Sequence, residues 1–407
     1  MTEPFHPPGT PEYAAFPLAA TGGPAGVFTA RSVADVVRAV AAARRAGRPL
    51  RLVTTGLALG RTAPLTGSLL LRPLIDAPVQ VNPDARTARV PAGRTWGDVL
   101  PAALRHGLTA VHPASAAVGV IGYLLGGGVS FYGRRFGLAS NMVRSLTVVL
   151  AGGEVVEARA TNRPDLLWAL RGGGGGIGVV VAAEIELVPM PAVVTGTAWW
   201  DLADAPRLGP LWQAWARAAP LEITTSLRLL TRAGRRVLAL DGVAVAPDRH
   251  VVDEMMSRLP APLANTWAPA MLPLTHPDRP RPAASQSDSA LIRELDEEGW
   301  ARLQEAALTV ELRQLGGALA TPATSGGALD RLAAPLLYYA AGAAEELRAV
   351  RSALGPFLTG YTAPTFVDHF DLPQRTLDDY TRVRVERIRH DADPAGLFAG
   401  DIDAVRK

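Results

Sequence analysis

The sequence contains no cysteine, and Lys407, its last residue, is the only lysine among its 41 Lys and Arg residues. Without cysteine the chain has no disulfide, zinc–thiolate site, iron–sulfur cluster, thiol nucleophile or cysteinyl attachment of a cofactor. A Schiff-base lysine and a phosphate-loop lysine are excluded as well, because no lysine precedes the last position. Two absences therefore remove several enzyme classes.

Long hydrophobic runs and strong charge are also lacking. The N-terminal segment has no basic n-region, no apolar h-region and no span of 18 apolar residues, so we expect a cytoplasmic protein with no membrane partner. The formal net charge is only +3, and the arginines are scattered singly or in pairs, which predicts no nucleic-acid partner. Use of Arg for Lys, with abundant Ala, Gly and Pro, suggests a high-GC bacterial coding sequence.

What is present is enough apolar material for a large core. The chain has 407 residues, of which 48% are hydrophobic and 19% are charged. That composition excludes a wholly disordered protein, and the length predicts two domains or one large α/β unit.

The first 190 residues predict small α/β units. Ser32 can cap a helix over 33–46 that Gly47 ends, because its apolar residues fall on one 3.6-period face. A second helix is expected from about 95 to 104 and a third over 165–170. Short strands are expected at 50–53, 68–71, 79–82, 87–90, 145–152, 154–159 and 179–188. Pro189 and Pro191 then indicate a boundary.

Beyond residue 193 the pattern changes to longer alternating segments. Strands are expected in VVTGTAWWDL, ITTSLRLL, RRVLALDGVAVA and ALTVELRQLGG, with helices over 210–218 and 248–258. This alternation is typical of an antiparallel sheet with one face covered. A further helix, over 377–388, is expected near the end of the chain.

A glycine run, RGGGGGIG, contains the string Gly173-x-Gly175-x-x-Gly178. The dinucleotide fingerprint needs a strand before this string and a helix after it, whereas a helix precedes and a strand follows here. A Rossmann site is therefore not indicated. Glycines at such density still let backbone approach a ligand closely or take positive φ, although a flexible surface loop would give the same string.

Two other glycine-bearing segments precede the run: TTGLALG at 54–60 and VGVIGYLLGGG at 118–128. With GRRFGLASN (133–141), DLLWALRGGGGGIGVV (165–180), ELRQLGGALA (311–320) and RVRVERIRHDADPAGLF (382–398), they occur in a recognisable order. The chain resembles the berberine-bridge-enzyme-like branch of the vanillyl-alcohol oxidase family of FAD-linked oxidoreductases, from about Pro11 to its end.

The resemblance implies an α+β fold with a two-part PCMH-type FAD-binding domain. Residues 1–190 would form its first part and residues 359–407 would return to it. Residues 191–358 would form a substrate domain with an antiparallel sheet covered by helices, lying over the flavin ring. The walls of such a domain do not identify the substrate.

The resemblance also implies which residues bind FAD. Main-chain N–H groups of residues 54–58 would neutralise the pyrophosphate, which suits a chain without lysine there. The segment 118–128 would follow the ribityl chain and the ring, and residues 178 and 179 would lie near the adenosine half. The expected cofactor-binding residues are Thr54, Thr55, Gly56, Leu57, Ala58, Ser115, Val118, Gly119, Gly122, Tyr123, Gly126, Gly127, Gly128, Gly178 and Val179. We also expect the loop 175–178 to line the cofactor.

The chain departs from the family at its covalent attachment points. Leu57 stands where many relatives have a flavin-linked His, and Ser115 stands where a subset has a Cys. We therefore expect non-covalent FAD. Val118 occupies the position of a small residue that lets molecular oxygen reach the flavin, which favours reoxidation by oxygen; an ordinary core valine is the equal alternative.

The catalytic tyrosines of alcohol-oxidising relatives are also replaced. Val129 and Phe366 occupy those positions, and Asp368 stands where Asn is usual. The resemblance places the segment FVDHF (366–370) on the substrate side, and strand alternation would put Asp368 on the face of Phe366 and His369 on the other. We therefore expect the catalytic residues among Asp368, Tyr132 and His369, with Asp368 the preferred base. Tyr338 and Tyr339 are further candidates, and each of these residues has a structural role as its alternative.

The expected activity is that of an FAD-dependent oxidoreductase, or oxidase, acting on a small or medium organic molecule in bacterial specialised metabolism. Hydride would pass to flavin N5, and the protein would supply orientation and a base. No histidine has metal-ligand spacing, so no metal is expected. Because the usual His and tyrosines are lost, two alternatives stay open: a redox-neutral cyclase or pericyclase that keeps FAD as a scaffold, and a non-enzymatic flavin- or ligand-binding protein.

Overall fold

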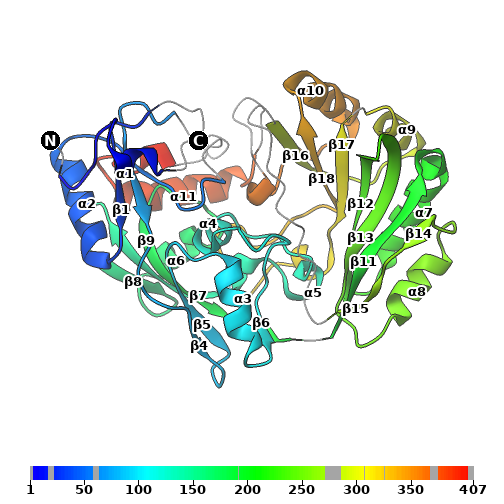
Figure 1. Cartoon of the computed structure of the whole chain (residues 1–407), viewed down its shortest axis with the longest axis horizontal. Helices are drawn as coiled ribbons and strands as arrows, with labels where there is room; N and C mark the ends of the chain where they lie inside the picture. The colour runs from blue at the N-terminus through cyan, green and yellow to red at the C-terminus, as the bar shows by residue number, and fades with distance from the viewer. Residues whose placement is uncertain are drawn as a thin grey trace.

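The computed structural model describes residues 3–16, 23–57, 64–190, 192–270, 286–306, 308–324, 326–366 and 375–401. Figure 1 shows two lobes, with both chain ends on the same one. Strands up to residue 189 and strands from residue 193 belong to different sheets. This separation supports the boundary that we propose near residue 190.

The first lobe begins with a parallel sheet whose strand order is β1-β3-β2. Its strands are β1 (Gly26–Ala30), β2 (Leu50–Leu52) and β3 (Leu69–Pro73), beside the short helix α1 (Pro11–Ala14). Helix α2 (Val33–Arg45) begins as predicted at Ser32, whose side chain and that of Asp35 cap each other's backbone N–H groups. Its apolar residues Val36, Ala39 and Val40 are fully buried.

A second sheet of the same lobe has the order β4-β5-β9-β7-β8. It contains β4 (Gln80–Asn82), β5 (Thr87–Pro91), β7 (Val143–Leu150), β8 (Val155–Arg159) and β9 (Gly178–Glu186). Helices α3 (Trp96–Leu104), α4 (Val120–Leu125), α5 (Gly133–Phe136) and α6 (Pro164–Leu170) belong to this part, and β6 (Leu108–Thr109) pairs with β10 (Val188–Pro189). Helix α6 precedes the glycine run and β9 follows it, which confirms that the dinucleotide-fingerprint context is absent.

The second lobe is built on an eight-stranded antiparallel sheet. Its order is β14-β11-β13-β12-β17-β18-β16, with β15 also paired to β11. The strands are β11 (Val193–Asp201), β12 (Ile223–Arg232), β13 (Arg235–Ala244), β14 (Ala264–Asn265), β15 (Ala268–Ala270), β16 (Gln286–Ile292), β17 (Thr309–Gln314) and β18 (Leu336–Gly342). All four segments predicted here as strands are strands, whereas β14, β15, β16 and β18 were not predicted.

Helices cover one face of this sheet, as predicted. Figure 1 shows α7 (Ala205–Ala218) and α8 (His250–Ser257) on the outer side, and α9 (Glu297–Gln304) and α10 (Ala344–Ala353) lie near its upper end. The outward residues of β12, β13 and β17, such as Leu227, Leu240 and Val310, are fully buried beneath them with Trp200 and Trp212. The other face of the sheet is directed toward the first lobe.

The end of the chain returns to the first lobe. Helix α11 (Asp379–Ala392) begins two residues after its predicted start. It packs on α6, and its Ile388 joins the core of the β5-β9-β7 sheet. Leu397 and Phe398 are buried against β2 and α2. These contacts support our proposal that residues 359–407 complete the first domain.

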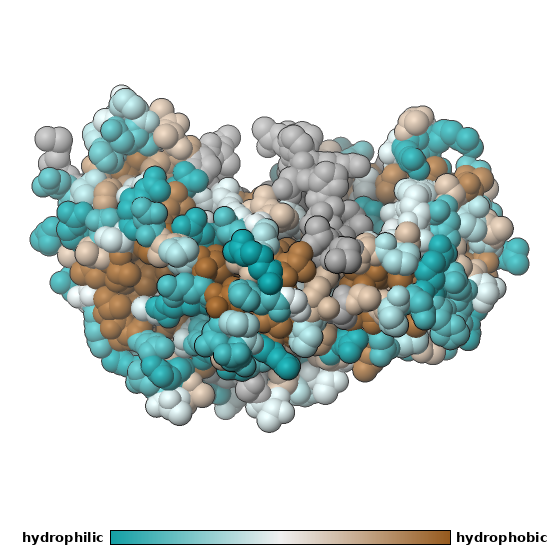
Figure 2. Space-filling model, turned by 60° about the horizontal axis from the view of Figure 1, so that its bottom comes forward, coloured by the Kyte–Doolittle hydropathy of each residue, from teal (hydrophilic) through white to brown (hydrophobic). Residues whose placement is uncertain are grey.

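The described part of the chain contains no helix long and apolar enough to cross a membrane. On the face drawn in Figure 2, hydrophobic atoms form separate patches divided by hydrophilic side chains.

Candidate functional site

The three glycine-bearing segments predicted from the sequence meet around α4. A Cβ atom added at Gly119 would lie 3.2 Å from Oγ1 of Thr54, so the first two segments are in contact. The N–H of Gly174 donates to the carbonyl oxygen of Leu125 over 3.0 Å, which joins the glycine run to the end of α4. One small region thus contains all three segments.

The loop after β2 presents free donors to this region. Within the described part of the chain, no hydrogen bond is found for the N–H groups of Thr54, Thr55 and Gly56, and Gly56 has a φ of +82°. Consecutive unpaired backbone N–H groups near a positive-φ glycine form a concavity that suits a phosphate. Leu57 is 52% exposed beside them, and Ala58 lies outside the described residues.

Glycines of α4 and its C-terminal end have two different surroundings. Gly122 is exposed, and a Cβ there would meet nothing within 4 Å, so it opens a cradle on the helix surface. Gly127 and Gly128 have φ of +93° and +73°, and a Cβ would lie 2.7 Å from Leu329 at the first and 2.6 Å from Tyr123 at the second. The positive-φ pair therefore requires glycine for both conformation and space.

The glycine run is held by the C-terminal helix. Arg389 of α11 donates from Nη2 to the carbonyl oxygen of Gly173 over 2.6 Å and from Nε to that of Gly175 over 3.0 Å. A Cβ at Gly178 would lie 2.6 Å from the carbonyl oxygen of Val149, and Val179 is fully buried. These contacts fix the backbone of the run against β7 and α11.

Four buried rings follow one another beside α4. Trp96 contacts Tyr123 with ring centroids 5.6 Å apart and contacts His112 at 6.4 Å, and His112 contacts Tyr132 at 5.3 Å. Within the part of the chain that the structure describes, the terminal polar atom of each ring has no hydrogen-bond partner: Nε1 of Trp96, Nε2 of His112 and the hydroxyls of Tyr123 and Tyr132.

His112 is a neutral acceptor in this row. Burial lowers its pKa to about 4, although its contact with the carbonyl oxygen of Pro113 opposes the shift. Nδ1 lies 2.6 Å from that oxygen, so Nδ1 carries the proton and Nε2 presents a lone pair. Burial raises the pKa of Tyr132, so its hydroxyl stays protonated and can donate a hydrogen bond.

Polar side chains cross the eight-stranded sheet in two rows, on the face opposite the helices. Strand register sets Thr197 opposite Asp241, Asp241 opposite Ser226, and Ser226 opposite Arg313. Register also places Arg228 opposite Glu311, Glu311 opposite Tyr339, and Tyr339 opposite Ser289. Side chains of a strand alternate between faces, so these residues point away from the helix-covered core. The first row consists of Thr197, Asp241, Ser226 and Arg313. The second row consists of Arg228, Glu311, Tyr339 and Ser289. We call them together the polar rows.

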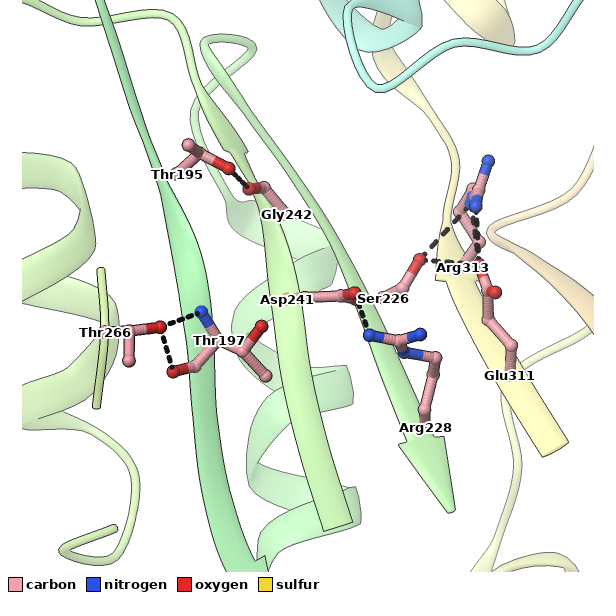
Figure 3. Close-up of polar contacts among 9 residues, drawn as sticks. All are labelled: Thr195, Thr197, Ser226, Arg228, Asp241, Gly242, Thr266, Glu311 and Arg313. Atoms are coloured by element: carbon pink, nitrogen blue, oxygen red, sulfur yellow. Dashed lines mark hydrogen bonds and ion pairs between the residues drawn. The ribbon is translucent and has the colours of Figure 1, made fainter. Parts of the chain in front are cut away.

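Four charged members of the polar rows form linked ion pairs, drawn in Figure 3. Arg228 binds Asp241. Arg313 binds Oε1 of Glu311 through Nη2 at 2.7 Å and through Nε at 2.8 Å, and Ser226 donates to the same oxygen over 2.8 Å.

The two carboxylates of these pairs differ in protonation. Burial raises the pKa of Asp241 to about 7, against the opposing charge of Arg228. Burial also disfavours the ionised form of Glu311, but Arg313 and Arg228 outweigh it and lower the pKa of Glu311. Glu311 is therefore the lasting anion of the group.

Arg313 connects the polar rows to the first lobe. Its guanidinium lies 4.4 Å from the ring centroid of Phe131, which follows the triple glycine, and 5.1 Å from that of Phe366. Burial raises the pKa of Tyr123 on α4, and the positive charge of Arg313 opposes this shift. The polar rows and the α4 cradle thus face one another across the junction between the lobes.

The predicted catalytic residues have different outcomes. Tyr132 is the last of the four buried rings beside α4, and it packs in one cluster with Val193, Val243 and Val245. Asp368 and His369 lie outside the described residues. Phe366 ends a 3-10 helix, Pro364–Phe366, so the strand alternation used to orient its neighbours does not hold at that residue. Tyr338 lies in the helix-covered core and Tyr339 lies in the polar rows.

The other predicted positions lie near the cradle. Ser115 and Val118 are half-buried, and Val118 packs against the core of the β5-β9-β7 sheet. Val129 is buried beside Leu329. The structure describes no group of His, Asp and Glu residues that could hold a metal ion.

Sequence reasoning missed the charged residues of the polar rows and Arg389. One signal was available for the rows: Arg228 and Asp241 each interrupt an otherwise uncharged run within a strand, ITTSLRLL and VLALDGVA. A charge at an inward position of such a strand indicates a polar site. No local signal distinguishes Arg389 from its neighbouring arginines.

Comparison with known proteins shows which family the first part of the chain is similar to. Residues 24–159 match the family described as "FAD binding domain". The chain is 30% identical over 196 residues to an uncharacterized FAD-linked oxidoreductase, YgaK, of Bacillus subtilis, covering 47% of this chain and 42% of that protein. It is 32% identical over 160 residues to (R)-6-hydroxynicotine oxidase of Paenarthrobacter nicotinovorans, covering 39% and 35%. The chain thus spans less than half the length of these relatives.

The whole fold has a counterpart among solved structures. Berberine-bridge-enzyme-like 1 of Physcomitrella patens superposes with a TM-score of 0.84 at 20% identity, covering 98% of this chain and 96% of that one. The predicted α+β fold and the resemblance to this group of FAD-linked oxidoreductases are confirmed.

The residues of the region fit FAD. The unpaired N–H groups of Thr54, Thr55 and Gly56 suit a pyrophosphate, and the open surface at Gly122 leaves room for a flat ring.

Proposed function

We propose that this chain, which carries an FAD binding domain within a berberine-bridge-enzyme-like fold, is an FAD-dependent oxidoreductase of small or medium organic molecules. The observation that supports it most is the junction described above, where a cofactor cradle with unpaired donors faces a polar, half-buried sheet surface. We place its physiological role in bacterial specialised metabolism, in the cytoplasm. The named activities of the relatives support the reaction type and leave the substrate undefined.

Bound FAD would supply the redox chemistry, as the acceptor of a hydride from the substrate at N5. The residues of this chain orient the substrate between the cradle and the polar rows, exclude water, and accept the proton that leaves with the hydride. We retain Asp368 as the proposed proton acceptor, with Tyr132 and His369 as alternatives. Molecular oxygen is the proposed final electron acceptor, and it would be reduced to hydrogen peroxide by the two electrons.

The proposal of an oxidase is tested by measuring oxygen consumption and peroxide formation with FAD-loaded protein and a panel of alcohols, amines and hydroxy acids. A true substrate should yield one peroxide for each product molecule. Product formed without oxygen consumption or any other electron acceptor would instead support the redox-neutral cyclase or pericyclase.

Replacement of Asp368 by Asn tests the proposed base. Asn keeps the volume and removes the carboxylate, so turnover should fall roughly 10²-fold or more, as for a positioned general base, with FAD content unchanged. Full turnover in Asp368→Asn, together with its loss in His369→Ala or in Tyr132→Phe, would move the assignment to that residue.

A further inference from the structure

Arg313 is the most enclosed cation on the side of the sheet that faces the cradle. Its side chain is 9% exposed and lies against Phe131 of the first lobe and Phe366 of the segment leading to α11. Two aromatic rings from different parts of the chain thus hold one guanidinium at the junction of the lobes.

Hydrogen bonds fix which edge of this guanidinium is available. Nε donates to Ser226 over 3.2 Å and to Glu311 over 2.8 Å, and Nη2 binds Glu311 at 2.7 Å. Among the described residues, none accepts a hydrogen bond from Nη1 of Arg313. Nη1 still reaches solvent, so this edge is open to an acceptor on a ligand, and a charge-assisted hydrogen bond there would favour binding.

The charges of the polar rows favour an anion over a neutral acceptor. Arg228 and Arg313 are permanent cations, and Glu311 is held ionised by them. Burial keeps Asp241 partly protonated near neutral pH. Among the described residues, two full positive charges therefore face less than two negative charges, and a carboxylate would complete the balance.

We propose that Arg313 binds a carboxylate of the substrate, and that the substrate class is organic acids with an aromatic or apolar body. The rings of Phe131 and Phe366 flank the guanidinium, and Tyr339 lies 5.9 Å from Phe366, so apolar surface adjoins the anion-binding edge. The inference rests on the proposed function, because only an enzyme has a substrate. Binding of the carboxylate itself requires no turnover.

Calorimetric titration of the FAD-loaded protein at pH 7 tests the proposal, with benzoate and its neutral counterpart benzamide as probes. The parent should bind benzoate about tenfold or more tightly than benzamide, the effect expected of one charge-assisted hydrogen bond. Equal binding of the two probes, or no detectable benzoate binding, would overturn the proposal without any variant being made.

Arg313→Gln should raise the benzoate Kd about tenfold or more and remove the preference over benzamide. Arg232→Gln is the matched control: it removes the same charge at an exposed end of the same sheet, where Arg232 lies over Trp199. Its benzoate Kd should stay within about twofold. An unchanged Kd in Arg313→Gln, or an equal loss in Arg232→Gln, would overturn the assignment.

The same titrations separate this inference from the proposed function. Protein that binds benzoate through Arg313 but never consumes oxygen or reduces its flavin would retain the anion site and refute the oxidoreductase. Protein that oxidises neutral compounds and binds benzoate and benzamide alike would retain the oxidoreductase and refute the anion site.

Discussion

Arg389 and Gly173 lie 216 positions apart in the sequence, yet the Arg389 guanidinium donates to the Gly173 carbonyl oxygen over 2.6 Å. The same side chain also binds the carbonyl oxygen of Gly175. The helix α11 therefore fixes the backbone of a loop of the proposed FAD-binding domain.

Arg389→Met should weaken FAD binding about tenfold and lower the melting temperature. Each lost hydrogen bond from a buried charged donor is worth about 1.5–3 kcal/mol, and Met retains the apolar stem. FAD titration followed by flavin fluorescence measures the first effect, and differential scanning calorimetry measures the second.

Arg387→Met provides the control for this prediction, because Arg387 is exposed on the same helix. It should change neither quantity appreciably. If both variants lose FAD alike, the effect comes from net charge, and the contact with the glycine run has no special role.

Gly127→Val should abolish FAD retention while the eight-stranded sheet still folds. The φ of +93° disfavours a β-branched residue, and its Cβ would lie 2.7 Å from Leu329. Gly360→Val is the matched control, since Gly360 also has positive φ but meets nothing within 4 Å. FAD content after purification and near-UV circular dichroism distinguish the two. Full FAD retention in Gly127→Val would make this loop an ordinary turn.

The flavin should be released when the protein is precipitated with acid. The resemblance implies that Leu57 and Ser115 stand at the two positions where relatives attach flavin covalently, and neither side chain would form those bonds. Yellow supernatant and colourless pellet are the expected result. Flavin that remains with the pellet would refute non-covalent binding.

Asp241 should make the protein less stable as pH rises from about 4 to about 7. Its folded pKa, about 7, lies above its ordinary value of 3.8 because of burial, so the folded state holds a proton that the unfolded state releases in this range. The stabilisation is complete below the ordinary value and is lost as pH rises through the folded one. Its slope is at most about 1.4 kcal/mol per pH unit for one proton.

Urea unfolding of the parent and of Asp241→Asn between pH 4 and pH 8 measures this contribution. Asn keeps the shape and does not titrate, so the difference in free energy of unfolding between the two proteins should change with pH in the stated direction. A pH-independent difference would show that Asp241 titrates normally in the folded protein.

Local patterns were sufficient to predict much of the fold. The Ser32 cap, the 3.6-residue period of α2 and the alternation in β12 and β13 are each contained in a short segment, and the structure reproduces them. Strand β16 was not predicted, because QSDSALI begins with polar residues, and its pairing with β18 is a long-range contact. The order of the glycine-bearing segments led to the resemblance and hence to FAD.

The polar rows could not be derived in the same way. Asp241 and Arg313 come together only through the register of β13, β12 and β17, and register depends on pairings between distant segments. The contact of Arg389 with Gly173 likewise joins segments that are far apart in the sequence. For Asp241 and Arg313 the sequence offered only charges at inward strand positions.

Anaerobic mixing of the FAD-loaded protein with its substrate tests the central claim, oxidation by flavin, most directly. The account predicts that the visible absorbance of the flavin bleaches in proportion to the substrate added and returns when air is admitted. Product that accumulates while the flavin absorbance stays unchanged would contradict it.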